Sequence, residues 1–141
     1  MAPLRGRGVV LLVDDDLGVR SVAGRILREA GYVVIEAADG LQAWTLFLRE
    51  PESFHVVVAD VVMPRMPGTE LAARIQARRP ELPVLLMSAY TDADLTARGL
   101  LAAPGTLVTK PFDAATLVAS VERALGRQGR SGSQPTDRPA P

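Results

Sequence analysis

The sequence has 141 residues, of which 48% are hydrophobic and 23% charged, so it is long enough for one globular domain with a single core. Lys and Arg total 16 residues, as do Asp and Glu, and this balance argues against a protein that binds a nucleic-acid backbone through a basic excess. The absence of cysteine excludes disulfides, thiolate metal sites and a cysteine nucleophile, and the single histidine, His55, cannot build a multi-histidine metal site.

The chain has the pattern of one domain with short flanking segments. No apolar run approaches the roughly 20 residues of a membrane helix, and residues 1–8 lack a signal-peptide core. Residues 127–141 consist mostly of Gly, Ser, Gln, Pro and Arg without apolar periodicity, which predicts a disordered tail. We therefore expect a cytoplasmic protein with a leader at 1–8, a domain at 9–126 and a tail at 127–141, and with no membrane or nucleic-acid partner.

Five short apolar runs are the expected strands, at residues 9–13, 32–35, 55–59, 83–87 and 106–109. The first is apolar at every position, as expected of a strand that is buried on both faces. Helical stripes of apolar residues lie between the runs, and this alternation predicts βα units around a parallel sheet. The expected fold class is therefore α/β.

The first two expected helices have start and stop signals. Asp16 is the expected N-cap of the first helix, which stops at Gly31. Asp39 opens the second helix, which Pro51 ends. The residues expected to face inward are Val19, Val22, Ala23, Ile26, Leu27 and Ala30 in the first helix, and Leu41, Trp44, Phe47 and Leu48 in the second.

Three more helices are expected in the second half of the chain. The third ends before Pro80, and a capping-box pattern from Thr91 to Asp94 starts a short fourth helix. Asp113 caps the fifth helix, which Gly126 closes. The apolar stripes are Leu71, Ala72 and Ile75 in the third helix, and Ala114, Leu117, Val118, Val121 and Leu125 in the fifth.

Residues that can handle a phosphoryl group follow four of the five apolar runs. Asp14 and Asp15 follow the first run, Asp60 the third, Ser88 the fourth and Lys110 the fifth. Ligands bind outside the carboxyl ends of the strands in an open parallel sheet, and a flavodoxin-like order of 2-1-3-4-5 makes the first and third strands neighbours. An oxygen-only cluster of carboxylates suits a hard cation, best Mg²⁺. Asp60 is then the expected phosphoacceptor, while Lys110 and Ser88 supply positive charge and a hydroxyl donor.

Each of these residues taken alone also has an ordinary structural interpretation. Asp60 and Ser88 are common turn or cap residues, and Lys110 is of a type that is usually solvated at a strand end. His55 stands at the start of a strand and is interpreted as structural. The site is favoured because all of its parts occur together at successive strand ends.

These residues resemble the receiver domain of two-component response regulators. The resemblance covers about residues 9–126 and implies a flavodoxin-like (βα)5 three-layer sandwich with sheet order 2-1-3-4-5. The segments that carry it are Leu12-Val13-Asp14-Asp15-Asp16, Ala59-Asp60-Val61-Val62-Met63-Pro64 with Gly68, Met87-Ser88-Ala89 and Thr109-Lys110-Pro111-Phe112.

The resemblance implies a signalling switch. Asp60 would take a phosphoryl group from a histidine kinase or a phosphotransfer histidine, and Ser88 and Lys110 would bind the phosphoryl oxygens. The implied Mg²⁺ ligands are Asp15, Asp60, the backbone carbonyl of Val62 and, through water, Asp14. The chain would catalyse its own phosphorylation, switch a surface for an unknown downstream protein, and exist as a monomer or a weak phosphorylation-dependent dimer. The Lys110–Pro111 peptide is often cis in this family.

The chain departs from the family pattern in two respects. Leu107 stands where the family usually has a Tyr or Phe that moves with the switch. Val62 and Tyr90 stand at the positions that tune dephosphorylation, and neither offers an acid or amide to orient an attacking water. We therefore expect a long phosphoryl lifetime.

Two other functions are compatible with parts of the sequence. A pseudo-receiver, which binds partners without phosphorylation, would usually lack one of the acidic or lysine positions that this chain keeps. A metal-dependent phosphohydrolase would need a second acid where Val62 stands. The resemblance fits a stand-alone receiver and the receiver of a hybrid sensor kinase equally well.

Overall fold

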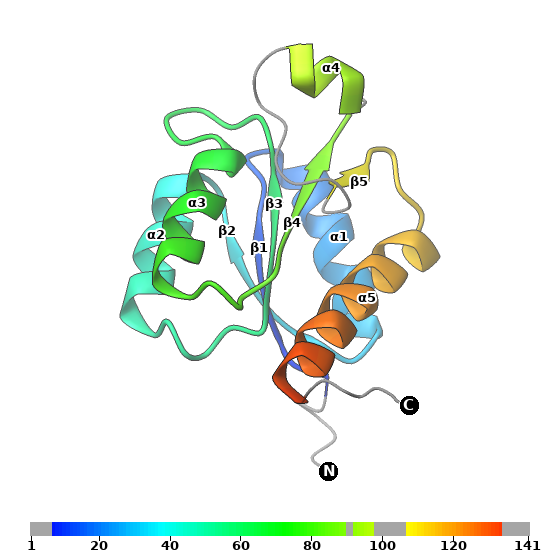
Figure 1. The fold of residues 1–141 in the computed structure, drawn as a ribbon. Helices are drawn as coiled ribbons and strands as arrows, with labels where there is room; N and C mark the ends of the chain where they lie inside the picture. Colours follow the sequence, from blue (N-terminus) through cyan, green and yellow to red (C-terminus); the bar gives the residue numbers. More distant parts are fainter. Residues whose placement is uncertain (1–6, 90–91, 98–106, 134–141) are drawn as a thin grey trace.

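A computed structural model describes residues 7–89, 92–97 and 107–133 of the chain. Five parallel strands form one sheet in the order β2-β1-β3-β4-β5 (Figure 1). The fold class and the strand order predicted from the sequence are therefore confirmed. The elements are β1 (Val9–Val13), α1 (Leu17–Glu29), β2 (Val33–Ala37), α2 (Gly40–Arg49), β3 (Val56–Asp60), α3 (Gly68–Arg78), β4 (Val84–Ser88), α4 (Asp92–Ala97), β5 (Leu107–Thr109) and α5 (Ala114–Ser133).

The sheet separates two apolar clusters, because successive strand residues point to opposite faces. Leu11 and Val13 of β1 pack with residues of α2 and α3 on one face. Val10 and Leu12 pack with residues of α1 and α5 on the other face. Figure 1 shows these helix pairs on the two sides of the sheet, which is the expected three-layer sandwich.

Four apolar helix residues that we expected to face inward are exposed instead, one of which is Ala114, the first residue of α5. Val22 of α1 is 56% exposed, and Leu41 and Leu48 of α2 are also exposed. The buried stripe of α2 runs through Ala43 and Phe47, which lie one helical turn apart. The sequence prediction was wrong here because these helices carry more apolar residues than the stripe that contacts the sheet can bury.

Helix starts follow the predicted caps. The carboxylates of Asp16, Asp39 and Asp113 accept hydrogen bonds from backbone N–H groups three residues further on, at 3.0, 2.8 and 2.7 Å. These contacts satisfy donors that a helix leaves unpaired at its N-terminus. The predicted cap at Thr91 lies outside the described residues.

β1 has the expected bounds, one or both bounds of each of the other four strands shift by one or two residues, and α5 ends later than Gly126. The helix continues through Ser133, so residues 127–133 of the expected tail are helical. Gly126 does not stop α5, because glycine in a helix interior only weakens it. The leader and the remaining tail stay predictions. No helix in the described part of the chain is long and apolar enough to cross a membrane.

Candidate functional site

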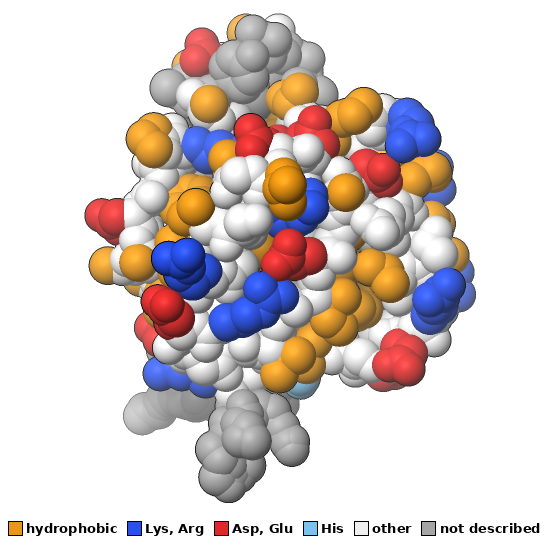
Figure 2. All heavy atoms as spheres, turned by 180° about the vertical axis from the view of Figure 1, so that it is seen from behind, with side chains coloured by type: hydrophobic (Ala, Val, Ile, Leu, Met, Phe, Trp, Pro, Cys, Tyr) orange, Lys and Arg blue, Asp and Glu red, His pale blue; other side chains and the backbone are white. Residues whose placement is uncertain are grey.

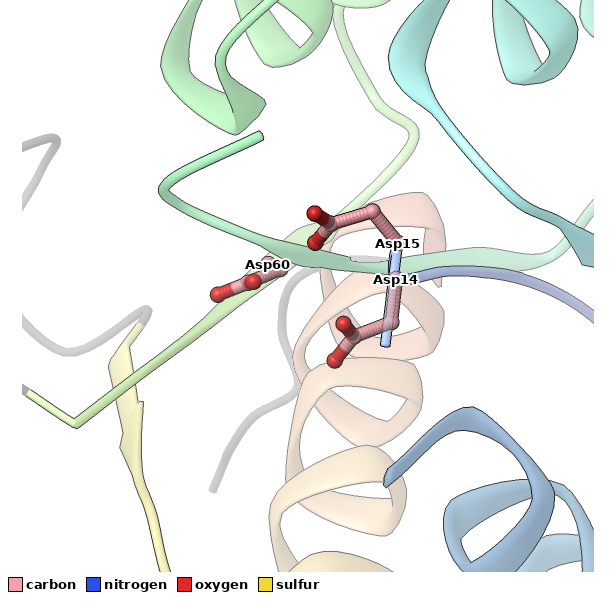
Figure 3. A group of neighbouring side chains, drawn as sticks. All are labelled: Asp14, Asp15 and Asp60. Carbon is pink, nitrogen blue, oxygen red and sulfur yellow. The ribbon is translucent and has the colours of Figure 1, made fainter. Parts of the chain in front are cut away.

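Three carboxylates meet at the carboxyl end of the sheet. β1 and β3 are parallel neighbours with Val13 opposite Ala59, so the residues that follow in the chain, Asp14 and Asp60, lie side by side. One oxygen from each of Asp14, Asp15 and Asp60 lies within 4.8 Å of the other two. Figure 3 shows the Asp14 and Asp15 side chains extending in opposite directions from the chain, with the Asp60 carboxylate between the levels of the other two.

Burial differs among the three carboxylates. Asp14 is fully buried and Asp60 is 9% exposed, whereas Asp15 is exposed. Buried carboxylates need a compensating charge or hydrogen bonds, because burial penalises the ionised form. The site therefore has two buried carboxylates, Asp14 and Asp60, and one exposed carboxylate, Asp15.

Lys110 places a positive charge beside the two buried carboxylates. Its Nζ lies 3.1 Å from Oδ2 of Asp14 and 3.4 Å from Oδ1 of Asp60. The backbone N–H of Lys110 donates to the carbonyl of Ser88 at 2.7 Å, which fixes the chain just after β5. The Lys110–Pro111 peptide bond is cis, as is often the case in the family that the sequence resembles.

The electrostatics of the site make Asp60 a weaker acid than an ordinary aspartate when no cation is bound. Burial raises the pKa of Asp60 to about 6, Lys110 opposes this rise, and the carboxylates of Asp14 and Asp15 add to it. Burial by itself would lower the pKa of Lys110, but the hydrogen bond to Asp14 and the charge of Asp60 outweigh it, so the pKa is raised. Lys110 therefore stays charged, and one lysine is shared by two buried acids.

This donor set fits a hard divalent cation. Three carboxylates offer oxygens close to one another, and Lys110 alone balances only one of their charges. Oxygen ligands without histidine or thiolate suit Mg²⁺. Asp14, Asp15 and Asp60 are the residues that would hold it.

The structure also places the other predicted site residues. Ser88, the last residue of β4, is buried next to Met87, which pairs with Asp60 across the sheet. Val62 follows β3 with its side chain 48% exposed. Leu107 is partly buried and packs against the core of the α2 and α3 face. Tyr90 lies outside the described residues.

The structural interpretations of two residues are confirmed. His55 accepts a hydrogen bond at Nδ1 from the backbone N–H of Val9 at 2.9 Å, so it joins the starts of β1 and β3. Asp16 caps α1 through Val19. Neither belongs to the carboxylate cluster.

Two features of the site were missed by the sequence reasoning. An open hollow of about 620 Å³ lies beside Lys110, and its lining includes Gly18, Val22 and Phe112. Arg20 of α1 donates from Nη1 to the backbone carbonyl of Asp14 at 2.7 Å. The only sequence signal for Arg20 is a charged residue one turn into a helix that follows an acidic run, and that signal does not identify a backbone partner.

Comparisons with known proteins agree with the fold. A family model described as the response regulator receiver domain matches residues 10–122. The chain is 36% identical over 126 residues to the sensor kinase CckA of Brucella abortus (strain 2308), covering 89% of the chain and 13% of that protein. It is 36% identical over 120 residues to the DNA-binding transcriptional regulator NtrC of Escherichia coli (strain K12), covering 84% of the chain and 25% of that regulator.

A solved structure has a similar fold. The crystal structure of the receiver domain from the hybrid histidine kinase CckA has a TM-score of 0.70 and 34% sequence identity, covering 84% of the chain and 99% of that domain. The chain thus spans nearly the whole of a solved receiver domain but a quarter or less of the two curated relatives.

Proposed function

Because the chain belongs to the response regulator receiver domains of two-component signalling, we propose that Asp60 accepts a phosphoryl group from a phosphohistidine donor in the presence of Mg²⁺. The donor is a histidine kinase or a histidine phosphotransfer protein, and the modification switches a protein-binding surface. The observation that carries this proposal is the cluster of Asp14, Asp15 and Asp60 with Lys110 between two of its members.

Each residue of the site has a role in the transfer. An oxygen of Asp60 attacks phosphorus, the P–N bond of the donor breaks, and its electron pair stays on the imidazole nitrogen. Lys110 and the hydroxyl of Ser88 bind the phosphoryl oxygens, whose charge increases as the group is transferred. When bound, Mg²⁺ would add positive charge beside these oxygens. The residues that would hold it are Asp15, Asp60, the backbone carbonyl of Val62 and, through water, Asp14.

The hollow beside Lys110 supports a protein donor. Leu17 and Val22 expose apolar side chains on α1, and the hollow is lined by Val22, Gly18 and Phe112 among others. An apolar surface beside Lys110, whose Nζ lies 3.4 Å from Asp60, suits a donor helix that carries its histidine to Asp60. We propose no nucleic-acid or membrane partner, and the downstream partner stays unidentified. That the protein is a monomer or a weak dimer stays a prediction, and so does its cytoplasmic location.

The test is the intact mass of the protein after incubation with acetyl phosphate and Mg²⁺. We expect the gain of one phosphoryl group in the wild type, and no gain in Asp60→Asn or in wild type with EDTA. Beryllofluoride with Mg²⁺, followed by NMR, covers the case of a poor small-molecule donor. No adduct and no shift of the Asp60 region would overturn the proposal and favour the pseudo-receiver alternative.

Replacing Val62 with asparagine is expected to shorten the lifetime of the phosphorylated protein several-fold. Val62 is exposed beside the acceptor strand, and its apolar side chain cannot orient a water for attack on phosphorus, whereas an amide can. The decay of the phosphorylated mass is followed after the donor is removed. Val62→Leu is the matched control and should decay like the wild type. Equal decay rates in Val62→Asn and Val62→Leu would contradict this prediction.

A further inference from the structure

Arg20 connects α1 to the backbone of the acidic site. Its Nη1 donates to the carbonyl oxygen of Asp14 at 2.7 Å, and its Nε donates to Oε1 of Glu36 on β2 at 3.1 Å. The Arg20 side chain is only 15% exposed. A planar guanidinium can hold two acceptors in fixed directions, which a lysine ammonium on a flexible stem cannot do equally well.

The carbonyl that Arg20 holds belongs to the peptide between Asp14 and Asp15. The N–H of Asp14 is held as well, because it donates to the carbonyl of Ala37 at 3.2 Å. Within residues 7–89, 92–97 and 107–133, no side chain pairs with the exposed carboxylate of Asp15. The orientation of this carboxylate in the metal-free protein therefore depends on the peptide plane that precedes it.

The anchor of Arg20 is itself held in place. Oε2 of Glu36 accepts from Nη1 of Arg28 at 2.9 Å, and Nη2 of Arg28 donates to the carbonyl of Val34 at 3.0 Å. Gly24 leaves space for this carboxylate inside α1, since a Cβ there would lie 2.9 Å from Oε2 of Glu36. Glycine is unfavourable inside a helix. At position 24 its missing side chain leaves room for the carboxylate of Glu36. In Figure 2, side chains of both charges lie next to one another near the middle of the face seen from behind.

We propose that Arg20 is a positioning residue for the divalent cation of the acidic site. By holding the Asp14–Asp15 peptide from α1, with Glu36 as its anchor, Arg20 keeps the Asp15 carboxylate aimed at the oxygens of Asp14 and Asp60. Residues that orient metal ligands typically contribute about 10-fold or more to metal affinity. This inference rests on the proposed function, because it concerns the same cation site.

The test is the Mg²⁺ dissociation constant of the metal-free protein, measured by calorimetry. Arg20→Lys keeps the charge but loses the two-point contact, and we expect it to weaken Mg²⁺ binding by about 10-fold. Arg25→Lys is the matched control, because Arg25 is an exposed arginine of the same helix that contacts neither Glu36 nor Asp14 in the described part of the chain. We expect this control to keep wild-type affinity.

Arg20→Gln separates positioning from charge. If Arg20 acted only as a nearby positive charge, its removal would reduce repulsion and tighten Mg²⁺ binding. Positioning requires weaker binding instead. The NMR signal of the Asp15 backbone amide, recorded without metal, should also shift in Arg20→Lys and Arg20→Gln. Both variants disturb the hydrogen bond from Arg20 to the Asp14 carbonyl, which belongs to the same peptide group as the Asp15 N–H.

The outcomes distinguish this inference from the proposed function. Wild-type protein that binds no Mg²⁺ would overturn both. Wild-type protein that binds Mg²⁺, with Arg20→Lys binding equally well, would overturn the positioning role alone. If Arg20→Lys fails to fold, as judged by circular dichroism, Glu36→Ala replaces it. This variant removes the acceptor that anchors Arg20 without altering Arg20 itself, and unchanged Mg²⁺ affinity in a folded Glu36→Ala would then overturn the inference.

Discussion

Substituting Gly68 with alanine is expected to lower the free energy of unfolding by about 3 kcal/mol or more. A Cβ at Gly68 would lie 2.2 Å from the carbonyl oxygen of Asp60, 2.9 Å from the Asp60 carbonyl carbon and 3.1 Å from Cα of Val61. These neighbours are backbone atoms at the end of a buried strand, so no side-chain rotation can relieve the clash. Asp60 must shift, and phosphorylation by acetyl phosphate should fall together with stability.

Urea unfolding of Gly68→Ala and Gly126→Ala measures this effect against a matched control. Gly126 lies inside α5, and a Cβ added there meets no atom within 4 Å. Alanine at Gly126 should raise the free energy of unfolding by about 0.5–1 kcal/mol, because alanine favours the helix. Equal changes in the free energy of unfolding for the two variants would show that the backbone of Asp60 does not exclude a Cβ at position 68.

Asp60→Asn is expected to stabilise the metal-free protein by about 2–3 kcal/mol at pH 7. The pKa of Asp60 is raised to about 6 from 3.8, chiefly by burial. A shift of about two units corresponds to about 3 kcal/mol of cost for keeping the folded protein ionised. An amide at Asp60 avoids that cost, so activity and stability oppose one another at this position.

The pH dependence of this gain follows from the direction of the pKa shift. Above pH 6 Asp60 is ionised in both the folded and the unfolded chain, and the full cost is present. As pH falls from about 6 toward 4, the folded protein takes up the proton first and the cost disappears. The advantage of Asp60→Asn over wild type should therefore be largest at pH 7 and vanish near pH 4.

Urea unfolding with EDTA at pH 7, 6, 5 and 4 checks this expectation. Asp15→Asn removes an exposed carboxylate of the same cluster and serves as the control, with a smaller gain expected. Saturating Mg²⁺ should reduce the advantage of Asp60→Asn, because binding stabilises the folded wild type. A gain that does not change between pH 7 and pH 4 would be incompatible with burial of an ionised Asp60.

The sequence determined the fold class, the strand order and the residues of the acidic cluster. The apolar runs, and the polar residues at their ends, can be recognised from neighbouring residues in the sequence alone; these residues are Asp14, Asp60, Ser88 and Lys110. Parallel strands then bring their carboxyl ends to one edge of the sheet. Caps are equally local, since Asp16 contacts a residue three positions away. The resemblance to receiver domains, which the family comparison supports, combined these signals.

Tertiary structure alone decided how the site is held and which helix residues are buried. The contact of Lys110 with Asp14 spans 96 positions, and Arg20 contacts the Asp14 carbonyl only because α1 packs beside β1 and β2. Val22 is exposed because the sheet covers only one stripe of α1. The raised pKa of Asp60 likewise depends on burial and on charges brought from other segments. Local patterns fix what each residue can form with its chain neighbours, whereas distances and desolvation between distant segments exist only once the chain has packed.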